Sequence, residues 1–135
     1  MLKVGIVDDR QIDLDKVVGI VSQIEGVEIV FATTSAEEAY ERIKKEEISL
    51  LIADIEMPHL SGYELADIIH SHALHIDVIF VTANSGYAVH AFEINVHDYI
   101  MKPYTKDRLI NSIERILERT QQAEITGRLY IKHRN

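Results

Sequence analysis

The strongest constraint on the fold is an alternation that repeats five times along the 135-residue chain: a short apolar run, then a segment with helical spacing. The apolar runs cover about residues 2–7, 27–31, 48–53, 77–82 and 97–101. Four of the five are nearly all apolar, which is typical of strands covered on both faces. The alternation predicts an α/β fold: a doubly wound, five-stranded parallel sheet joined by right-handed crossovers.

The segments between the apolar runs carry helix signals. Ser35 to Glu38 and Ser61 to Glu64 have the Ser-x-x-Glu form of a capping box, which predicts that the second and third helices begin there. A short helix is expected over about residues 86–93. Apolar residues recur with helical spacing at Leu14, Val17, Val18, Val21, Ile24, Leu65, Ile68, Ile69, Ala88, Val89, Phe92, Leu109, Ile113, Ile116 and Leu117.

Composition narrows the class of protein. Hydrophobic residues make up 47% of the chain, enough for a core, and no apolar run is long enough to span a membrane. There is no cysteine, so a disulfide framework is excluded, and together these features favour a cytoplasmic protein with no membrane partner. The net charge is −8, although residues 128–135 hold three cations and no acid. A body this acidic is a poor nucleic-acid binder on its own.

Chemistry-bearing residues follow four of the predicted strands. Asp8 and Asp9 come after the first, Asp54 after the third, Thr82 ends the fourth, and Lys102 follows the fifth. The carboxyl ends of parallel strands gather at one edge of a sheet, which favours the strand order 2-1-3-4-5 and a single pocket. Three carboxylates, one hydroxyl and one ammonium suit a divalent cation and a phosphoryl group.

Each of these residues also has a simpler interpretation. The Asp8–Asp9 pair could be an acidic helix start favoured by the helix dipole. Asp54 could be a nucleophile toward phosphorus, a third metal ligand, or both. Thr82 could bond to backbone, and Lys102 could be an ordinary surface lysine. Pro103, which follows Lys102, favours an extended residue before it and would aim that lysine back across the strand ends.

Other candidates are weaker. Tyr99 is either a half-buried aromatic residue of a strand or a ring that moves between exposed and buried positions. His70, His72 and His75 are close in sequence, but His70 and His72 cannot share a helix face and no cysteine accompanies them, so a zinc site is not expected. The usual glycine-rich dinucleotide, NTPase and hydrolase motifs are not found.

The motifs, taken together and in order, resemble those of a response-regulator receiver domain with the flavodoxin-like or CheY-like fold. The resemblance covers about residues 1–120. Its motifs are Val-Asp-Asp at 7–9, Asp-Ile-Glu-Met-Pro at 54–58, Leu-Ser-Gly-Tyr-Glu-Leu at 60–65, Phe-Val-Thr-Ala at 80–83 and Asp-Tyr-Ile-Met-Lys-Pro at 98–103.

The resemblance implies a specific site. Asp54 would be the phosphoacceptor, supplied by a sensor histidine kinase. Mg²⁺ or Mn²⁺ would be ligated directly by Asp9 and Asp54, through water by Asp8, and by the backbone carbonyl of Glu56. The phosphoryl group would be bound by Thr82, Ala83 and Lys102. Thr82 and Tyr99 would form the switch, and Glu56 and Asn84 would tune the phosphate lifetime.

A finer similarity links the segment from Thr82 to Tyr104 to receivers joined to LytTR-type DNA-binding domains. It implies control of transcription, with DNA bound only through a C-terminal domain. Residues 121–135 would then be a linker and the start of that domain, and the alternation from Arg128 could begin its first strand. The face made by the fourth helix, fifth strand and fifth helix could form a homodimer. Arg10 departs from the pattern, because many receivers carry an acid there.

Two other functions remain open. One is a Mg²⁺-dependent phosphohydrolase with an aspartyl-phosphate intermediate, in which Glu56 would take the place of a proton donor. The other is a pseudo-receiver that is never phosphorylated and acts only as an interaction module. The preferred interpretation is a signalling switch that is not a turnover enzyme.

Overall fold

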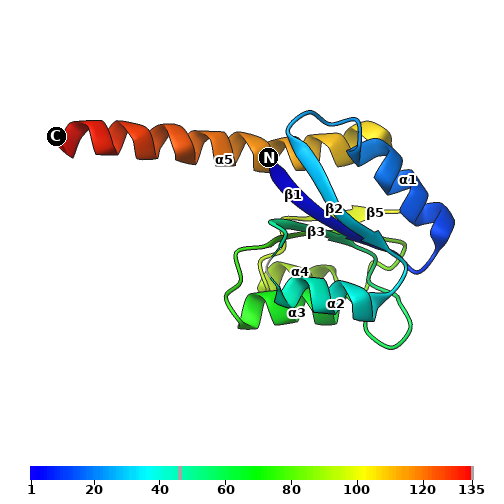
Figure 1. Cartoon of the computed structure of the whole chain (residues 1–135). Helices are drawn as coiled ribbons and strands as arrows, with labels where there is room; N and C mark the ends of the chain where they lie inside the picture. Colours follow the sequence, from blue (N-terminus) through cyan, green and yellow to red (C-terminus); the bar gives the residue numbers. More distant parts are fainter. Residues whose placement is uncertain (46, 135) are drawn as a thin grey trace.

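The computed structural model describes residues 1–45 and 47–134, with side chains up to residue 123 and that of Ile125. Five parallel strands form one sheet in the order β2-β1-β3-β4-β5, which confirms the predicted fold class and strand order (Figure 1). In chain order the elements are β1 (Leu2–Val7), α1 (Gln11–Val21), β2 (Val27–Thr33), α2 (Ala36–Lys44), β3 (Leu50–Ala53), α3 (Gly62–Ser71), β4 (Asp77–Thr82), α4 (Ala88–Glu93), β5 (Asp98–Met101) and α5 (Lys106–Arg134).

Helices cover both faces of the sheet. Figure 1 shows α1 and α5 on one face and α2, α3 and α4 on the other. Because strand side chains alternate between faces, Val4 and Ile6 of β1 pack with α1 and α5, whereas Val7 packs with α2 and α3. Two hydrophobic clusters therefore pack against the two faces of the sheet. Polar residues of a site can then lie only at the ends of the strands.

The register brings the site-bearing strand ends to one edge. Val7 pairs with Ala53, Ala53 pairs with Phe80, and Thr82 pairs with Met101. The residues that follow β1, β3, β4 and β5 therefore emerge at neighbouring points. This is the arrangement that the sequence predicts for the chemistry-bearing residues at the ends of these four strands.

The start of the fourth helix differs from its prediction. The sequence pattern predicts a helix from about residue 86, but α4 begins at Ala88. The side-chain oxygen of Asn84 accepts a hydrogen bond of 2.7 Å from the backbone of Gly86, and the Ala88 backbone donates to Ser85. This local turn competes with the helix for the same backbone groups, so the helix starts later.

The two predicted capping boxes have different outcomes. Ser61 and Glu64 form the complete reciprocal box at the start of α3. At α2, Ser35 accepts from the Glu38 backbone, but the Glu38 carboxylate accepts a 2.7 Å bond from the hydroxyl of Thr33. Because the Glu38 carboxylate bonds Thr33, at the end of β2, it does not bond the backbone N–H of Ser35. The second hydrogen bond of the capping box is therefore not formed.

The C-terminal part of the chain corrects another prediction. The alternation from Arg128 could begin a strand by its pattern, but the backbone of α5 is helical through Arg134. The preceding residues 118–125 are mostly good helix formers and contain no proline or glycine, so the helix started at Lys106 continues. Figure 1 shows this part of α5 running beyond the sheet.

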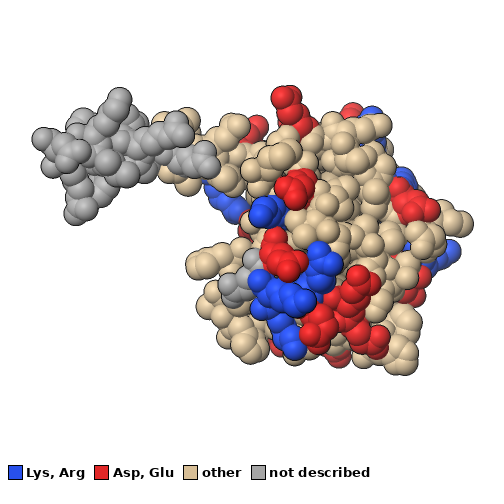
Figure 2. Space-filling model, in the orientation of Figure 1, with Lys and Arg blue, Asp and Glu red and all other residues tan. Residues whose placement is uncertain are grey.

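Surface charge is mixed on the face that carries α2. Figure 2 shows acidic and basic side chains side by side there, and the ion pairs Arg42–Glu47 and Lys44–Glu41 belong to this region. Within the described residues, no helix is both long enough and apolar enough to cross a membrane.

Candidate functional site

Three carboxylates converge at the carboxyl edge of the sheet. Asp8 and Asp9 follow β1, and Asp54 follows β3. One oxygen from each lies within 4.8 Å of the others. Asp8 and Asp54 are buried, with 3% and 6% of their surface exposed, whereas Asp9 is more open to solvent. Three like charges at this spacing repel one another unless cations offset them.

Backbone groups fix the two buried carboxylates. An oxygen of Asp8 accepts a 3.0 Å hydrogen bond from the backbone of Arg10, and an oxygen of Asp54 accepts one of 3.2 Å from the backbone of Glu56. Each aspartate thus bonds the residue two places further on, as in an Asx turn. The sharp exit from each strand follows from these bonds.

The start of α3 lies directly against the backbone of Asp54. The Gly62 N–H donates to the carbonyl of Ile55 at 2.9 Å. A Cβ atom at Gly62 would overlap the carbonyl oxygen of Asp54 and lie 2.8 Å from its carbonyl carbon. A glycine is therefore required at this position, because α3 and the backbone of Asp54 approach each other closely. This close packing holds in place the backbone that carries the Asp54 carboxylate.

Lys102 supplies the cation of the cluster. It follows β5, with a cis peptide bond to Pro103, and its backbone N–H donates to the carbonyl of Thr82 at 2.8 Å. Its ammonium lies 2.9 Å from Asp8, 2.9 Å from Asp54 and 3.0 Å from Asp13. The lysine is therefore part of the site and not an ordinary surface residue.

Burial and charge pairing act against each other at these groups. Burial raises the pKa of the Asp8 carboxyl above its usual value, although the Arg10 N–H and the Lys102 ammonium lower it in part. Burial alone would lower the pKa of Lys102, but hydrogen bonds to Asp54, Asp8 and Asp13 outweigh it, and the pKa is raised. The ammonium therefore stays charged at neutral pH.

A second chain of hydrogen bonds runs through Asn84. Its side-chain amide donates to the Glu56 carboxylate at 2.6 Å, and its backbone N–H donates to the Thr82 hydroxyl at 3.2 Å. The backbone carbonyl of Asn84 accepts a hydrogen bond from the hydroxyl of Tyr99. The loop after β4 thus connects four of the residues singled out in the sequence.

Thr82 lies at the end of β4 and Tyr99 lies within β5, as the sequence pattern predicts. Thr82 is 1% exposed, and among the described residues its hydroxyl has one hydrogen-bond partner, the backbone N–H of Asn84. Tyr99 is partly buried against Phe80, with ring centroids 5.9 Å apart and an interplanar angle of 78°. Burial raises the pKa of the Tyr99 hydroxyl. In this structure the threonine contacts backbone rather than a carboxylate.

Ion pairs attach β5, which contains Tyr99 and precedes Lys102, to α5. Asp98, at the start of β5, accepts two hydrogen bonds from Arg108, of 2.6 and 2.8 Å, and one of 2.9 Å from Arg115. Burial alone would raise the pKa of Asp98, but hydrogen bonds to its carboxylate, first of all from the Arg108 guanidinium, together outweigh burial and hold the pKa below its usual range. A bidentate arginine contact fixes orientation as well as distance.

Asp13 is the site residue that the sequence interpretation missed. It lies in the first turn of α1 and contacts both Lys102 and the Arg10 guanidinium, the latter at 3.6 Å. An acidic residue in the first turn of a helix is common, because the helix dipole favours it, so Asp13 carried no distinctive signal. The contact to Lys102 spans 89 positions in the sequence, so only the fold could reveal it.

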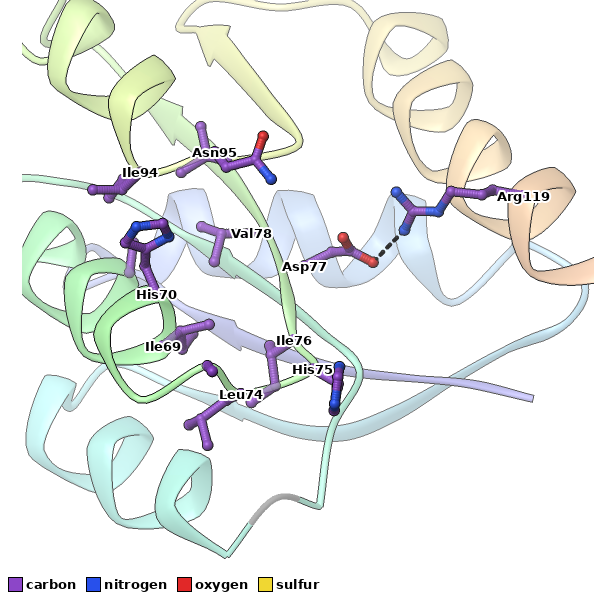
Figure 3. Close-up of a pocket in the computed structure, with 13 residues that line it drawn as sticks. Ile69, His70, Leu74, His75, Ile76, Asp77, Val78, Ile94, Asn95 and Arg119 are labelled. Atoms are coloured by element: carbon purple, nitrogen blue, oxygen red, sulfur yellow. Dashed lines mark hydrogen bonds and ion pairs between the residues drawn. The ribbon is translucent and has the colours of Figure 1, made fainter. Parts of the chain in front are cut away.

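One cavity opens at the site, and a second lies away from it. One of about 350 Å³ opens beside the ammonium and is lined by Arg10, Asp13, Lys16, Ala83, Lys102, Pro103 and Tyr104. Another, of about 400 Å³, lies at the opposite edge of the sheet, where Asp77 and Arg119 form an ion pair of 2.6 Å (Figure 3). His70 and His75 line this second cavity, which contains no residue of the carboxylate cluster.

The donor set fits a hard divalent cation. Carboxylate oxygens are the ligands that Mg²⁺ prefers, and it keeps several waters when bound by a few of them. Among the described residues, Asp8, Asp9 and Asp54 are the one group of three acidic or histidine side chains close enough to hold an ion. With Lys102 at its side, the cluster can bind a metal and a phosphoryl group together.

Comparisons with known proteins identify the class. Residues 4–114 match the family model of the response regulator receiver domain. The crystal structure of the response regulatory domain of protein mrkE from Klebsiella pneumoniae superimposes with a TM-score of 0.84 at 29% identity, covering 90% of this chain and 99% of that one. The chain therefore belongs to the response regulator receiver domains of two-component systems.

Two curated relatives narrow the subgroup. The transcriptional regulatory protein NatR of Bacillus subtilis (strain 168) is 59% identical over 135 residues, which cover 100% of this chain and 58% of that protein. The sensory transduction protein LytT of Bacillus anthracis is 30% identical over 132 residues, covering 98% of this chain and 53% of that protein. The predicted resemblance to LytTR-type regulators is confirmed, and the chain spans about half the length of these relatives.

Proposed function

We propose that this receiver domain is a phosphorylation switch in which Asp54 accepts a phosphoryl group. The observation that carries the proposal is the placement of Asp54 beside Asp8 and Asp9, with the Lys102 ammonium 2.9 Å from its carboxylate. A carboxylate oxygen of Asp54 forms a bond to phosphorus while the bond from phosphorus to the donor's leaving atom breaks, and that atom keeps the electron pair.

The metal belongs to the same proposal. Mg²⁺ or Mn²⁺ would be held by Asp8, Asp9, Asp54 and the backbone carbonyl of Glu56, and when bound it supplies positive charge beside the transferring group. Lys102 orients and neutralises a phosphoryl oxygen from the other side. The Thr82 hydroxyl and the backbone of Ala83 bind the remaining phosphoryl oxygens after Thr82 turns from its contact with Asn84.

The output is proposed to pass through Thr82 and Tyr99. In the present structure the Tyr99 hydroxyl donates to the backbone carbonyl of Asn84 in the loop before α4. When Thr82 moves toward the phosphoryl group it vacates space, and Tyr99 packs inward, which shifts the population of the protein toward the active state. The partner surface is the face formed by α4, β5 and α5. It includes the exposed side chains of Val89 and Phe92, with 70% and 84% of their surface accessible, which supports a homodimer or another protein contact.

Glu56 and Asn84 are proposed to set the lifetime of the phosphorylated state. Their 2.6 Å hydrogen bond joins the loops after β3 and β4. A water that attacks the phosphoryl group would have to pass these side chains. Replacing both residues should change the decay rate of the phosphorylated protein, and an unchanged rate would reject this role.

The partners follow from the same function. A sensor histidine kinase would donate the phosphoryl group, and a C-terminal domain like that of the LytTR-type regulators would bind DNA and control transcription. Residues 1–120 are proposed as the receiver, and residues 121–135 as the connection to that domain. The protein is then not a turnover enzyme, because the phosphoryl group rests on the protein itself until it is hydrolysed.

The test is a mass measurement. The protein is incubated with Mg²⁺ and acetyl phosphate, and its intact mass is recorded beside that of Asp54→Asn and of a sample containing a chelator. We expect a phosphate-sized gain only in the wild type with metal. No gain in the wild type would favour the pseudo-receiver, whereas steady turnover of small phosphoesters would favour the phosphohydrolase.

A further inference from the structure

A groove runs along α5 beside the end of α1. It has a volume of about 440 Å³ and lies between α5 and the residues that follow α1. Its apolar surface comes from three partly buried residues, Ile24, Ile110 and Leu117. One lysine and three acids also line it, the acids being Glu25, Glu114 and Glu118. The groove is therefore apolar and acidic, and it fits an amphipathic helix that carries basic residues.

The C-terminal part of α5 has the complementary composition. The helix runs beyond the sheet and its backbone is helical through Arg134 (Figure 1). In the sequence, residues 128–134 contain two arginines and one lysine but no acid. Ile125, which precedes them, is 50% exposed. Because the helix is continuous, this part cannot fold back onto the groove of its own chain, so a second copy of the chain is the partner that can supply it.

The spacing of residues along α5 defines one seam and its centre. Four residues of α5 that line the groove lie four, three and four positions apart: Ile110, Glu114, Leu117 and Gln121. Such steps keep residues on one side of a helix. The mirror image of this series, with steps of four, three and four, leads on to Ile125, Arg128 and Lys132. A series that is symmetrical about Gln121 fits two antiparallel helices related by a twofold axis.

We propose that this groove is a self-association surface, on which α5 of a second copy lies antiparallel with Gln121 at the twofold axis. In this register Glu114 meets Arg128 of the second copy, and Leu117 meets Ile125 of the second copy. Unlike charges and apolar side chains are thus matched along the seam. A parallel arrangement in register would instead place Glu114 against Glu114 and Arg128 against Arg128, which is repulsive. Charge therefore selects the antiparallel arrangement.

The proposed surface is separate from the face formed by α4, β5 and α5. Arg108 and Arg115 of α5 pair with Asp98 of β5 and mark the side of the helix that belongs to that face. Arg108 and Ile110 are two positions apart, which is about 200° around a helix. The groove beside α1 therefore lies on the other side of α5, and its use does not depend on phosphorylation of Asp54.

The register is tested by disulfide trapping, which the chain allows because it contains no cysteine. Under mild oxidation Gln121→Cys should form a covalent dimer, since position 121 meets its own counterpart at the twofold axis. Gln122→Cys is the matched control, because its side chain is about 100° further around the helix. A mixture of Leu117→Cys and Ile125→Cys should give the mixed dimer, whereas Leu117→Cys alone should not link to itself.

The charge pairing is tested by sedimentation equilibrium of the unmodified chain and its charge variants. Glu114→Arg should weaken self-association about tenfold, because the twofold axis turns two attractive pairs into two repulsive ones. Arg128→Glu should do the same, and the variant with both changes should return to the wild-type dissociation constant. Asp67→Arg, an exposed position of α3 on the opposite face of the sheet, makes the same change of charge and should have no effect.

Several results would overturn the proposal. A wild type that stays monomeric at every concentration would do so, as would equal disulfide yields for Gln121→Cys and Gln122→Cys. Self-linking of Leu117→Cys without the mixed dimer would indicate a parallel pair. A double charge variant that associates no better than the single variants would remove the pairing of Glu114 with Arg128. If Phe92→Asp on α4 abolished association and the charge variants did not change it, the contact would lie on the face of α4, β5 and α5 instead.

Discussion

Gly62→Ala is the substitution for which the structure makes the sharpest stability prediction. A methyl group at this position overlaps the carbonyl oxygen of Asp54 and lies 2.8 Å from its carbonyl carbon and 3.1 Å from the Cα of Ile55. These neighbours are backbone atoms that cannot rotate away. The start of α3 would therefore have to move away from the loop that carries the proposed phosphoacceptor.

The expected cost follows from three contributions. Overpacking costs about 1–3 kcal/mol, and weakening the Gly62–Ile55 backbone hydrogen bond costs about 1 kcal/mol more. The greater helix propensity of alanine returns up to about 1 kcal/mol. The net loss is about 2 kcal/mol, which in urea unfolding lowers the midpoint by roughly 1 M for a domain of this size.

Gly19→Ala is the matched control. Gly19 lies inside α1, and a Cβ atom there meets nothing within 4 Å. The same substitution should therefore stabilise the protein by about 0.5–1 kcal/mol. Phosphorylation by acetyl phosphate should be slowed roughly tenfold or more in Gly62→Ala, because the displaced carboxylate no longer faces the donor, and unchanged in Gly19→Ala. Equal urea midpoints for the two variants would refute the close-approach argument.

Three further predictions concern stability. Ser61→Ala removes one side of the capping box at α3 and should cost about 1 kcal/mol in urea unfolding. Asp98→Asn should lower stability by about 2 kcal/mol at pH 7, since it breaks the contacts to Arg108. Because the pKa of Asp98 is lowered in the folded state, its contribution is present above its unfolded value of about 4 and is lost as the pH falls below it. The difference between variant and wild type in thermal scans should therefore shrink in acid, and a constant gap would contradict the assignment. Mg²⁺ at about 100 times its dissociation constant should stabilise the wild type by about 2.7 kcal/mol and Asp9→Asn much less, as measured by thermal unfolding.

The sheet was predictable because its signals are local and repeated. Apolar runs of strand length, such as Leu2–Val7, report burial on both faces, and the parallel arrangement then places Asp8, Asp54 and Lys102 at one edge. Chemistry at strand ends is the part of a site that topology determines. The convergence of these three residues therefore followed from the order of the strands.

Features that depend on competition between neighbours were not predictable from the pattern. Glu38 bonds Thr33 instead of completing a capping box, and Asn84 forms a turn that delays α4. The strand expected from Arg128 is part of α5, because a period-two pattern in a short segment cannot outweigh a helix already in progress. Asp13 meets Lys102 only because the chain that follows β5 reaches the first turn of α1, a contact between residues distant in sequence.

The most direct test of the central claim is to locate the phosphoryl group on the chain. The protein treated with Mg²⁺ and acetyl phosphate is reduced with borohydride, which converts an aspartyl phosphate to homoserine, and its peptides are sequenced by mass spectrometry. We expect homoserine at position 54 and at no other aspartate, with none in the sample lacking the donor. Homoserine at Asp8, Asp9 or Asp13, or an unmodified Asp54 in a protein that has gained a phosphate, would contradict the account.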